Sequence, residues 1–238
     1  MRTEIRLTED GSHTLHVAEI DECYHSIHGA VRESLHIFAD AGFKAFFSFC
    51  REERCRETAL TPREIKVLEI GFGTGLNAYL TLLEGKISGK KIHYTALELY
   101  PLAVDKALQL NYAGMFEDES GVFERMHLSG WDEDADITSF FTLRKVKADF
   151  TVYELQGMFD VIYFDAFSPE KQSEMWSEGG FRKIYEHAAD GAVLTTYCAK
   201  GAVRRAMQSA GFIVERLPGP LGKREILRCR RIIPKRTS

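Results

Sequence analysis

Apolar runs alternate with helix-like segments between residues 65 and 215 of the chain. The runs expected to form strands are 67–70, 92–98, 141–147, 159–165, 192–198 and 212–217, and the segments expected to form helices are 77–84, 103–110, 173–189 and 200–210. Residues 159–165 are nearly all apolar, as expected for a strand that is covered on both faces. The alternation predicts a Rossmann-like α/β fold, in which helices pack on both faces of a mostly parallel sheet.

The two ends of the chain depart from this alternation. Residues 212–217 and 225–231 lie too close together in the sequence for a helix between them. They therefore predict an antiparallel hairpin at the C-terminal end of a seven-stranded sheet. Residues 1–60 do not fit the pattern and are expected to form an N-terminal cap or lid on a main domain of residues 61–238.

The segment Val-Leu-Glu-Ile-Gly-Phe-Gly-Thr-Gly-Leu-Asn at residues 67–77 predicts a tight glycine turn between a strand and a helix. Such a turn lets a nucleotide-like ligand approach the backbone closely. A dinucleotide site needs a further glycine where this chain has Leu76. The carboxylate of Glu69 would repel a pyrophosphate, but it suits the amino group and the sulfonium of S-adenosylmethionine (SAM). The segment therefore predicts a SAM site made by Glu69, Gly71, Phe72, Gly73, Thr74, Gly75 and Asn77.

Further carboxylates fall just at or past the ends of predicted strands, where a doubly wound sheet binds its ligands. Glu98 ends the second strand and is placed to accept both ribose hydroxyls of a nucleoside. We favour Asp149, after the third strand, as acceptor for the adenine amino group. Asp132 would take that place if the third strand were instead 122–128, within the irregular residues 112–140. A lone acid at a strand end is often a helix cap, but several acids in register with the glycine turn favour SAM.

The sequence Asp-Ala-Phe-Ser-Pro at residues 165–169 follows the fourth predicted strand, where methyltransferases bind the acceptor. An alkylamine acceptor has an unperturbed pKa of roughly 10 and must lose a proton before it can attack. A carboxylate within hydrogen-bond reach can orient the N–H and accept the proton. We therefore expect Asp165 and Phe167 to be catalytic, with Asp165 also facing the cofactor. The alternative is that Asp165 only caps the helix after it.

Composition and charge indicate where the protein works and what it can bind. No apolar run approaches the roughly 20 residues of a membrane span, and the N-terminus lacks the apolar core of a signal peptide, so we expect a cytoplasmic protein without membrane contact. Five cysteines without a C-x-x-C pair indicate free thiols. The net charge is −4, but residues 200–238 hold eleven Lys or Arg and two Glu. This basic cluster can bind a phosphate backbone, or it is an ordinary solvated surface.

Several segments together resemble the MnmC/MnmD-type methyltransferases. They are residues 69–77, 165–169 with Met175-Trp176, 196–197, 201–205, 210–212, 218–227 and an N-terminal element around Tyr24, Ser26, Gly29, Glu33 and His36. The resemblance implies SAM-dependent methylation of 5-aminomethyl-2-thiouridine at the tRNA wobble position. In the fused members of this family a FAD-dependent domain follows, whereas this sequence stops at Ser238. The resemblance thus implies a methyltransferase without FAD, with a separate enzyme supplying the aminomethyl substrate.

The resemblance also implies roles for individual residues. The SAM ligands would be Glu69, Gly71, Gly73, Glu98 and Asp149, and the catalytic acid Asp165. The residues that would bind the tRNA anticodon arm are Tyr24, Ser26, Lys200, Arg204, Arg205, Lys223 and Arg224. Phe167, Tyr24 and Tyr197 are candidates for stacking on a splayed base, although single aromatic residues more often belong to the core. No metal is expected.

Two other functions fit parts of the sequence. An aminopropyl or amine transferase of the spermidine-synthase type shares the fold and has an Asp after the fourth strand. It usually carries an internal aspartate in the glycine turn, which residues 71–75 lack, and it needs no basic C-terminal cluster. The other alternative is a SAM- or RNA-binding module without turnover, and the complete motif at residues 165–169 argues against it.

Overall fold

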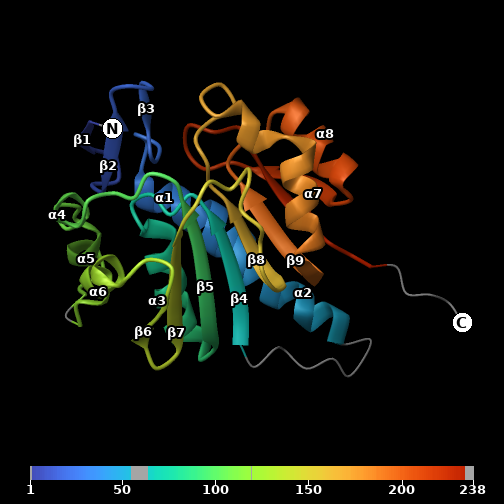
Figure 1. Cartoon of the computed structure of the whole chain (residues 1–238), viewed down its shortest axis with the longest axis horizontal. Coiled ribbons are helices and arrows are strands. Elements are labelled where there is room, and N and C mark those ends of the chain that lie inside the picture. Colours follow the sequence, from blue (N-terminus) through green and yellow to red (C-terminus); the bar gives the residue numbers. More distant parts are fainter. Residues whose placement is uncertain (1, 55–63, 119, 234–238) are drawn as a thin grey trace, which may run out of the picture.

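The centre of the molecule is an eight-stranded sheet with the strand order β10-β11-β9-β8-β4-β5-β7-β6 (Figure 1). The computed structural model describes residues 2–54, 64–118 and 120–233. The strands of this sheet are β4 (Glu64–Ile70), β5 (Lys91–Glu98), β6 (Asp134–Thr138), β7 (Phe141–Lys147), β8 (Phe159–Phe164), β9 (Ala188–Thr196), β10 (Ile213–Pro218) and β11 (Glu225–Arg230). The five central strands run parallel, whereas β6, β10 and β11 pair antiparallel with their neighbours.

The parallel centre and the antiparallel C-terminal hairpin confirm the predicted fold, with one strand more than the predicted seven. The additional strand is β6, which pairs with β7 at one edge of the sheet. Its sequence, Asp-Ala-Asp-Ile-Thr, is too polar to read as a buried strand. The structure buries Ile137 and leaves Asp134 and Asp136 exposed, as is typical of an edge strand with one face in water.

Residues 122–128 form a helix, α6 (Val122–Leu128), so the possible strand at this place is wrong. The carboxylate of Asp118 accepts hydrogen bonds from the backbone N–H groups of Val122 and Phe123. These bonds satisfy donors that the start of a helix leaves unpaired. Val122, Phe123 and Met126 are buried and have the spacing of one helix face.

The helix expected over residues 173–189 is shorter than the prediction. It consists of a 3₁₀ turn, η2 (Ser173–Trp176), and the helix α7 (Glu178–Glu186). The chain then enters β9 directly, and Gly191 lies inside that strand. There the pairing between β8 and β9 shifts register, so the glycine belongs to a bulge rather than to a helix cap.

Helices cover both faces of the sheet (Figure 1). α3 (Leu76–Ser88) packs on one face, and α7 and α8 (Gly201–Ala210) pack on the other. Successive side chains of a strand point to opposite faces, so Val67 belongs to the first hydrophobic core and Leu68 to the second. The short helices α4 (Val104–Ala107) and α5 (Tyr112–Met115) lie beside α6 on the side of β6 and β7.

The N-terminal part has two components. β1 (Thr3–Leu7), β2 (His13–Val17) and β3 (Glu22–Cys23) form a small antiparallel sheet. A continuous helix follows, made of α1 (Ala30–Ser34), a π-helical stretch η1 (Leu35–Lys44) and α2 (Ala45–Arg54). This helix packs on the main sheet, where the ring of Phe38 lies 5.2 Å from that of Tyr163. The predicted division at residue 60 falls among residues 55–63, outside the described residues, and stays a prediction.

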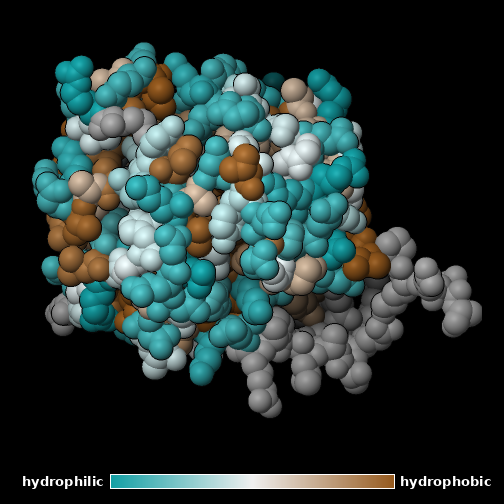
Figure 2. Space-filling model, viewed as in Figure 1, coloured by the Kyte–Doolittle hydropathy of each residue, from teal (hydrophilic) through white to brown (hydrophobic). Residues whose placement is uncertain are grey.

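The large apolar side chains at the surface include Leu7, Ile87 and Val152. On the face shown in Figure 2, hydrophilic residues predominate and hydrophobic ones occur in small separate groups. Within the described ranges no helix is long and apolar enough to cross a membrane. The apolar side chains are instead concentrated in the two cores, where Cys198 and Cys229 are buried free thiols.

Candidate active site

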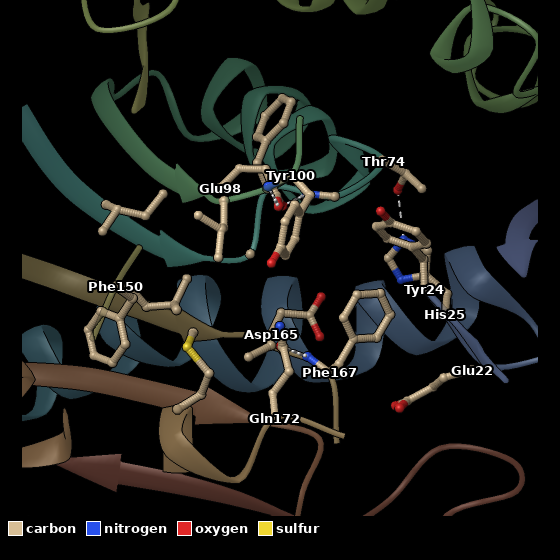
Figure 3. A pocket seen from close by; sticks show the side chains of 18 of the residues that line it. Glu22, Tyr24, His25, Thr74, Glu98, Tyr100, Phe150, Asp165, Phe167 and Gln172 are labelled. Atoms are coloured by element: carbon tan, nitrogen blue, oxygen red, sulfur yellow. Dashed lines mark hydrogen bonds between the residues drawn. The ribbon is translucent and has the colours of Figure 1, made fainter. Parts of the chain in front are cut away.

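A cavity of about 260 Å³ lies at the carboxyl ends of the parallel strands (Figure 3). The ends of β4 and β5, the segments that follow β7, β8 and β9, and residues 22–26 of the N-terminal part line it. The predicted site residues in the lining are Tyr24, Ser26, Gly71, Phe72, Gly73, Thr74, Glu98, Asp149, Asp165, Phe167, Tyr197 and Lys223. The sheet thus brings together carboxylates that are up to 67 residues apart in the sequence, since Glu98, Asp149 and Asp165 all lie beside the glycine loop.

The glycine loop packs against two other segments without room for side chains. Gly71 has a φ of 95°, and a Cβ there would lie 2.6 Å from the backbone oxygen of Asp165. Gly73 has a φ of 51°, and its Cβ would meet the ring of Tyr24 at 2.9 Å. L side chains rarely adopt these backbone conformations. The two glycines therefore allow Asp165 and Tyr24 to stand beside the same turn.

The carboxylate of Glu98 is held at the glycine loop. One oxygen accepts a hydrogen bond from the N–H of Gly73 at 3.0 Å, and the other accepts one from the N–H of Tyr100 at 2.8 Å (Figure 3). Burial raises the pKa of Glu98, while these backbone donors act in the opposite direction. The result is an oriented carboxylate with lone pairs left over for the hydroxyl groups of a ligand.

Asp149 reaches the cavity and Asp132 does not. Asp149 follows β7, and its Oδ1 accepts hydrogen bonds from the N–H and the hydroxyl of Thr151 at 2.8 and 2.7 Å. The carboxylate of Asp132 instead accepts a hydrogen bond from the N–H of Lys147 at 3.2 Å. Because residues 122–128 are a helix, β7 is the third parallel strand, and the acid that follows it is the one favoured from the sequence.

Asp165 comes directly after β8 and faces the cavity (Figure 3). Its N–H donates to the carbonyl oxygen of Ile70 at 2.9 Å, which ties it to the end of β4. Its side chain lines the cavity, and burial raises its pKa to about 7. The carboxylate of Glu33 raises the pKa further, whereas the Asn77 amide and Lys223 lower it. A carboxyl group that titrates near neutrality can accept and release a proton at working pH.

Aromatic rings stand next to Asp165. The rings of Tyr24 and Phe167 meet edge to face, with their centres 5.1 Å apart (Figure 3). The backbone of Phe167 is held from both sides, because its N–H donates to Gln172 Oε1 at 3.2 Å and its carbonyl accepts from Trp176 Nε1 at 2.8 Å. The loop that carries Asp165 and Phe167 is therefore supported independently of any ligand.

Some lining residues were not among the predicted site residues, notably Glu22, His25 and Tyr100. Glu22 accepts hydrogen bonds from the N–H and the hydroxyl of Ser168, both at 3.0 Å. His25 Nε2 lies 2.7 Å from the Thr74 hydroxyl, and burial lowers the pKa of His25 to about 4, so its ring is neutral. Glu22 and His25 belong to the N-terminal part, and only its docking on the main sheet brings them here. No local pattern in the sequence marks them.

Glu69, Gly75 and Asn77 do not line the cavity, although the glycine pattern predicted contact with the ligand. Glu69 lies on the same face of β4 as Val67, so its side chain points into the core below α3 and is fully buried. Asn77 stands between this acid and the cavity: its Nδ2 donates to Glu69 Oε1 at 2.9 Å and to Asp165 Oδ2 at 2.8 Å. These residues support the cavity from behind.

The predicted tRNA-binding cations differ in whether they line the cavity. Lys223 lines the cavity, where its Nζ lies 3.1 Å from a carboxylate oxygen of Glu33 and 4.9 Å from the centre of the Tyr197 ring. This ion pair with Glu33 holds the Lys223 ammonium group inside the cavity. The others, which do not line it, are Lys200, Arg204, Arg205 and Arg224.

The cavity is acidic. Among the described residues that line it, the carboxylates are Glu22, Glu33, Glu98, Asp149 and Asp165, and the lysine is Lys223. Because Lys223 is paired with Glu33, the remaining acids attract a cation and repel a pyrophosphate. SAM carries a sulfonium and an ammonium group, so the residues present fit this cofactor.

Comparison with known proteins agrees with this chemistry. A family model described as an S-adenosyl-L-methionine-dependent methyltransferase matches residues 134–231. The tRNA 5-methylaminomethyl-2-thiouridine biosynthesis bifunctional protein MnmC of Cupriavidus metallidurans is 27% identical over 233 residues, which cover 92% of this chain and 32% of that protein. The chain belongs to the SAM-dependent methyltransferases of the MnmC type. It spans about a third of the length of the curated relatives it matches.

Other relatives of this MnmC-type methyltransferase show the same pattern. The MnmC protein of Pseudomonas fluorescens strain Pf0-1 is 31% identical over 179 residues, which cover 67% of this chain and 26% of that protein. The crystal structure of MNMC2 from Aquifex aeolicus superposes with a TM-score of 0.76 at 22% identity and covers 98% of this chain and 71% of that one. Spermidine synthase from Thermotoga maritima gives a TM-score of 0.54 at 12% identity, with 97% and 72% covered. At these identities the two structures establish the class I SAM-methyltransferase fold alone.

The predicted fold and cofactor are therefore confirmed for this MnmC-type methyltransferase. The roles of individual site residues stay predictions, and the geometry sorts them into two groups. Glu98, Asp149 and Asp165 face the space that a ligand would fill, whereas Glu69 and Asn77 face one another behind it.

Proposed function

We propose that the chain transfers the methyl group of SAM to the aminomethyl nitrogen of 5-aminomethyl-2-thiouridine at the tRNA wobble position, giving 5-methylaminomethyl-2-thiouridine. The names of the MnmC relatives specify the biosynthesis of that nucleoside. The observation that carries the proposal is Asp165, a cavity carboxyl group with a pKa near neutrality. A tRNA substrate implies work in the cytoplasm, and a separate enzyme would supply the aminomethyl group.

The chemistry asks for a proton acceptor and a positioned amine. SAM, when bound, supplies an electrophilic methyl group on a sulfonium. An alkylamine is mostly protonated at neutral pH, so a carboxylate that orients its N–H and takes up the proton lowers the barrier. Asp165 would do this, because burial raises its pKa to about 7. The rings of Tyr24 and Phe167 would pack against the flat base of the splayed uridine.

The cofactor would be held on the other side of Asp165. Glu98 would accept hydrogen bonds from the two ribose hydroxyls, and Asp149 one from the adenine amino group. The loop at Gly71 and Gly73 lines the cavity, so its backbone would lie beside the nucleoside. The carboxylates of the lining would favour the charged methionine portion.

The decisive experiment is nucleoside mass spectrometry of tRNA from a strain that lacks the gene. Under the proposal, 5-aminomethyl-type uridine accumulates and the 5-methylaminomethyl form disappears. Expression of the chain restores the methylated form, and expression of the Asp165→Asn variant does not. An unchanged nucleoside profile would reject the proposal. In that case, transfer from decarboxylated SAM to putrescine would support the aminopropyl alternative, and SAM binding without any transfer would support a binding module.

We predict that Arg224→Glu weakens tRNA binding and makes it less sensitive to salt. Arg224 is exposed, and it directly follows Lys223, which lines the cavity. Each lost phosphate contact should lower the slope of log affinity against log salt by about 0.7–0.9. Filter binding of tRNA between low and physiological salt measures this slope.

The control is Lys91→Glu. Lys91 is exposed at the first residue of β5, at the opposite end of the sheet from the cavity, and the substitution changes the net charge equally. Its salt slope should match that of the unmodified chain. Equal slopes for Arg224→Glu and the control would remove Arg224 from the tRNA interface.

A further inference from the structure

Asn77 joins two carboxyl groups that are far apart in the sequence. It lies in the first turn of α3 and is buried. Its Nδ2 donates to Glu69 Oε1 at 2.9 Å and to Asp165 Oδ2 at 2.8 Å. An amide group carries two hydrogens on its nitrogen, so both are used here. If the Asn77 amide were turned by 180°, its oxygen would face the oxygens of both carboxyl groups. The hydrogen-bond network therefore favours the orientation with Nδ2 toward them.

Glu69 anchors this amide from the side away from the cavity. It is fully buried, and the hydroxyl of Tyr94 lies close enough to act as a hydrogen-bond partner of its carboxyl group. Burial raises the pKa of Glu69 well above its ordinary value, and the charge of nearby Asp165 adds to this. This shift disfavours the charged form of Glu69, and in either protonation state its carboxyl group offers an oxygen to Asn77.

We propose that Asn77, held in place by Glu69, is a positioning residue that orients Asp165 and stabilises its ionised form. The amide fixes Asp165 Oδ2, so that Oδ1 is left for the proton of the acceptor. This role differs from the one predicted from the glycine pattern, in which Glu69 and Asn77 contact SAM. The inference rests on the catalytic role given to Asp165 in the proposed function.

The first test titrates Asp165 directly, without tRNA or SAM. ¹³C NMR of the chain labelled at its aspartate carboxyl carbons reports the pKa, and Asp165→Asn assigns the signal. A hydrogen bond to a carboxylate favours its ionised form, so Asn77→Leu should raise the pKa of Asp165 by about one unit or more. An unchanged pKa overturns the inference. Because no acceptor is needed, this result is independent of whether the proposed tRNA reaction is correct.

Thr81→Val is the matched control for a buried polar side chain lost from α3. Thr81 lies one helical turn beyond Asn77, is equally buried, and donates to the Asn77 backbone carbonyl rather than to a carboxyl group. The pKa of Asp165 should be unchanged in this variant. An equal rise in both variants would mean that the shift reflects loosened packing and would also overturn the inference.

The second test separates positioning from cofactor binding. Glu69→Leu removes the oxygen that anchors Asn77, whereas Glu69→Gln keeps one. Glu69→Leu should lower kcat about tenfold or more, Glu69→Gln should recover most of this loss, and both should bind SAM within about threefold of the unmodified chain. Calorimetry measures SAM binding, and thermal unfolding confirms that each variant is folded.

A loss of SAM affinity of about tenfold or more in Glu69→Gln would identify Glu69 as an anionic cofactor ligand and overturn the inference. If Asn77→Leu does not fold, Asn77→Ser undergoes the same titration. Serine is too short to reach both carboxyl groups, so the pKa of Asp165 should rise in it as well. An unchanged value in a folded Asn77→Ser variant overturns the inference equally.

Discussion

Replacing Asp165 with asparagine is expected to lower methyl transfer by roughly 10²–10⁴-fold while SAM affinity changes by less than about tenfold. Asparagine keeps the size of the side chain and can still accept the hydrogen bond from Asn77, but it cannot take up the proton of the acceptor amine. Single-turnover assays with labelled SAM and modified tRNA measure the rate, and calorimetry measures the affinity. In the unmodified chain the rate should fall with decreasing pH below about 7, where Asp165 becomes protonated.

Asp160→Asn is the matched control. Asp160 lies at the other end of β8, where its carboxylate accepts a hydrogen bond from the N–H of Lys66, and it does not line the cavity. Its turnover should equal that of the unmodified chain. Nearly normal turnover of Asp165→Asn would remove Asp165 from catalysis. A loss of SAM affinity beyond about tenfold would instead make it primarily a cofactor ligand.

The same substitution should change how stability depends on pH. The pKa of Asp165 is raised in the folded chain to about 7, from an ordinary value of 3.8. The folded state therefore binds the proton more tightly than the unfolded state, and the stability of the unmodified chain falls as pH rises from about 4 to about 7. The Asp165→Asn variant has no such group, so its stability does not fall in this pH range. Urea unfolding should show that, relative to the unmodified chain, the variant is more stable above pH 7, by at most about 4 kcal/mol, and little changed near pH 4.

Replacing Glu98 with glutamine is expected to weaken SAM binding by about 100-fold or more. Hydrogen bonds to a charged group contribute about 1.5–3 kcal/mol each, and the proposal gives Glu98 two ribose hydroxyls. The side-chain amide of the glutamine would also place an NH₂ group against the backbone N–H of Gly73 or Tyr100. In the unmodified chain both N–H groups donate to the Glu98 carboxylate. Calorimetry with SAM measures the dissociation constant. At saturating SAM, kcat should change much less, because Glu98 does not touch the acceptor.

Glu64→Gln is the control for this loss of charge. Glu64 is exposed at the start of β4, at the end of the sheet opposite the cavity. Its SAM affinity should be unchanged. If Glu98→Gln bound SAM as well as this control, the ribose assignment would be wrong, and another carboxylate of the lining would have to take that role.

The central architecture follows from local patterns in the chain. β5 and β7 are expected and found at almost the same residues, because apolar and polar residues alternate over much of each strand, as in Ile92-His-Tyr-Thr-Ala and Phe141-Thr-Leu. The errors occur where local signals conflict. β6 is missed because its outward residues are acidic. The possible strand at α6 was raised because a seven-residue segment with four apolar residues fits either structure.

The cavity was predicted in part. Parallel strands end at the same edge of the sheet, so the acids after β5, β7 and β8 could be brought together from their order in the sequence alone. Glu22 and His25 could not, because they enter the cavity from the small N-terminal sheet through contacts that span more than a hundred residues, such as that between Glu22 and Ser168.

The sequence by itself determined the fold class, the glycine loop and the edge of the sheet at which a SAM site forms, because strand periodicity and backbone conformation at glycine are local properties. Only the tertiary structure decided which carboxylates face the cavity. Glu69 and Glu98 both come at the end of a strand, yet the pleat turns Glu69 into the core beneath α3, whereas Glu98 lies at the rim and is held there by two backbone donors. The pKa of Asp165 is likewise a tertiary property, since it depends on burial and on residues from α1, α3 and the loop after β10.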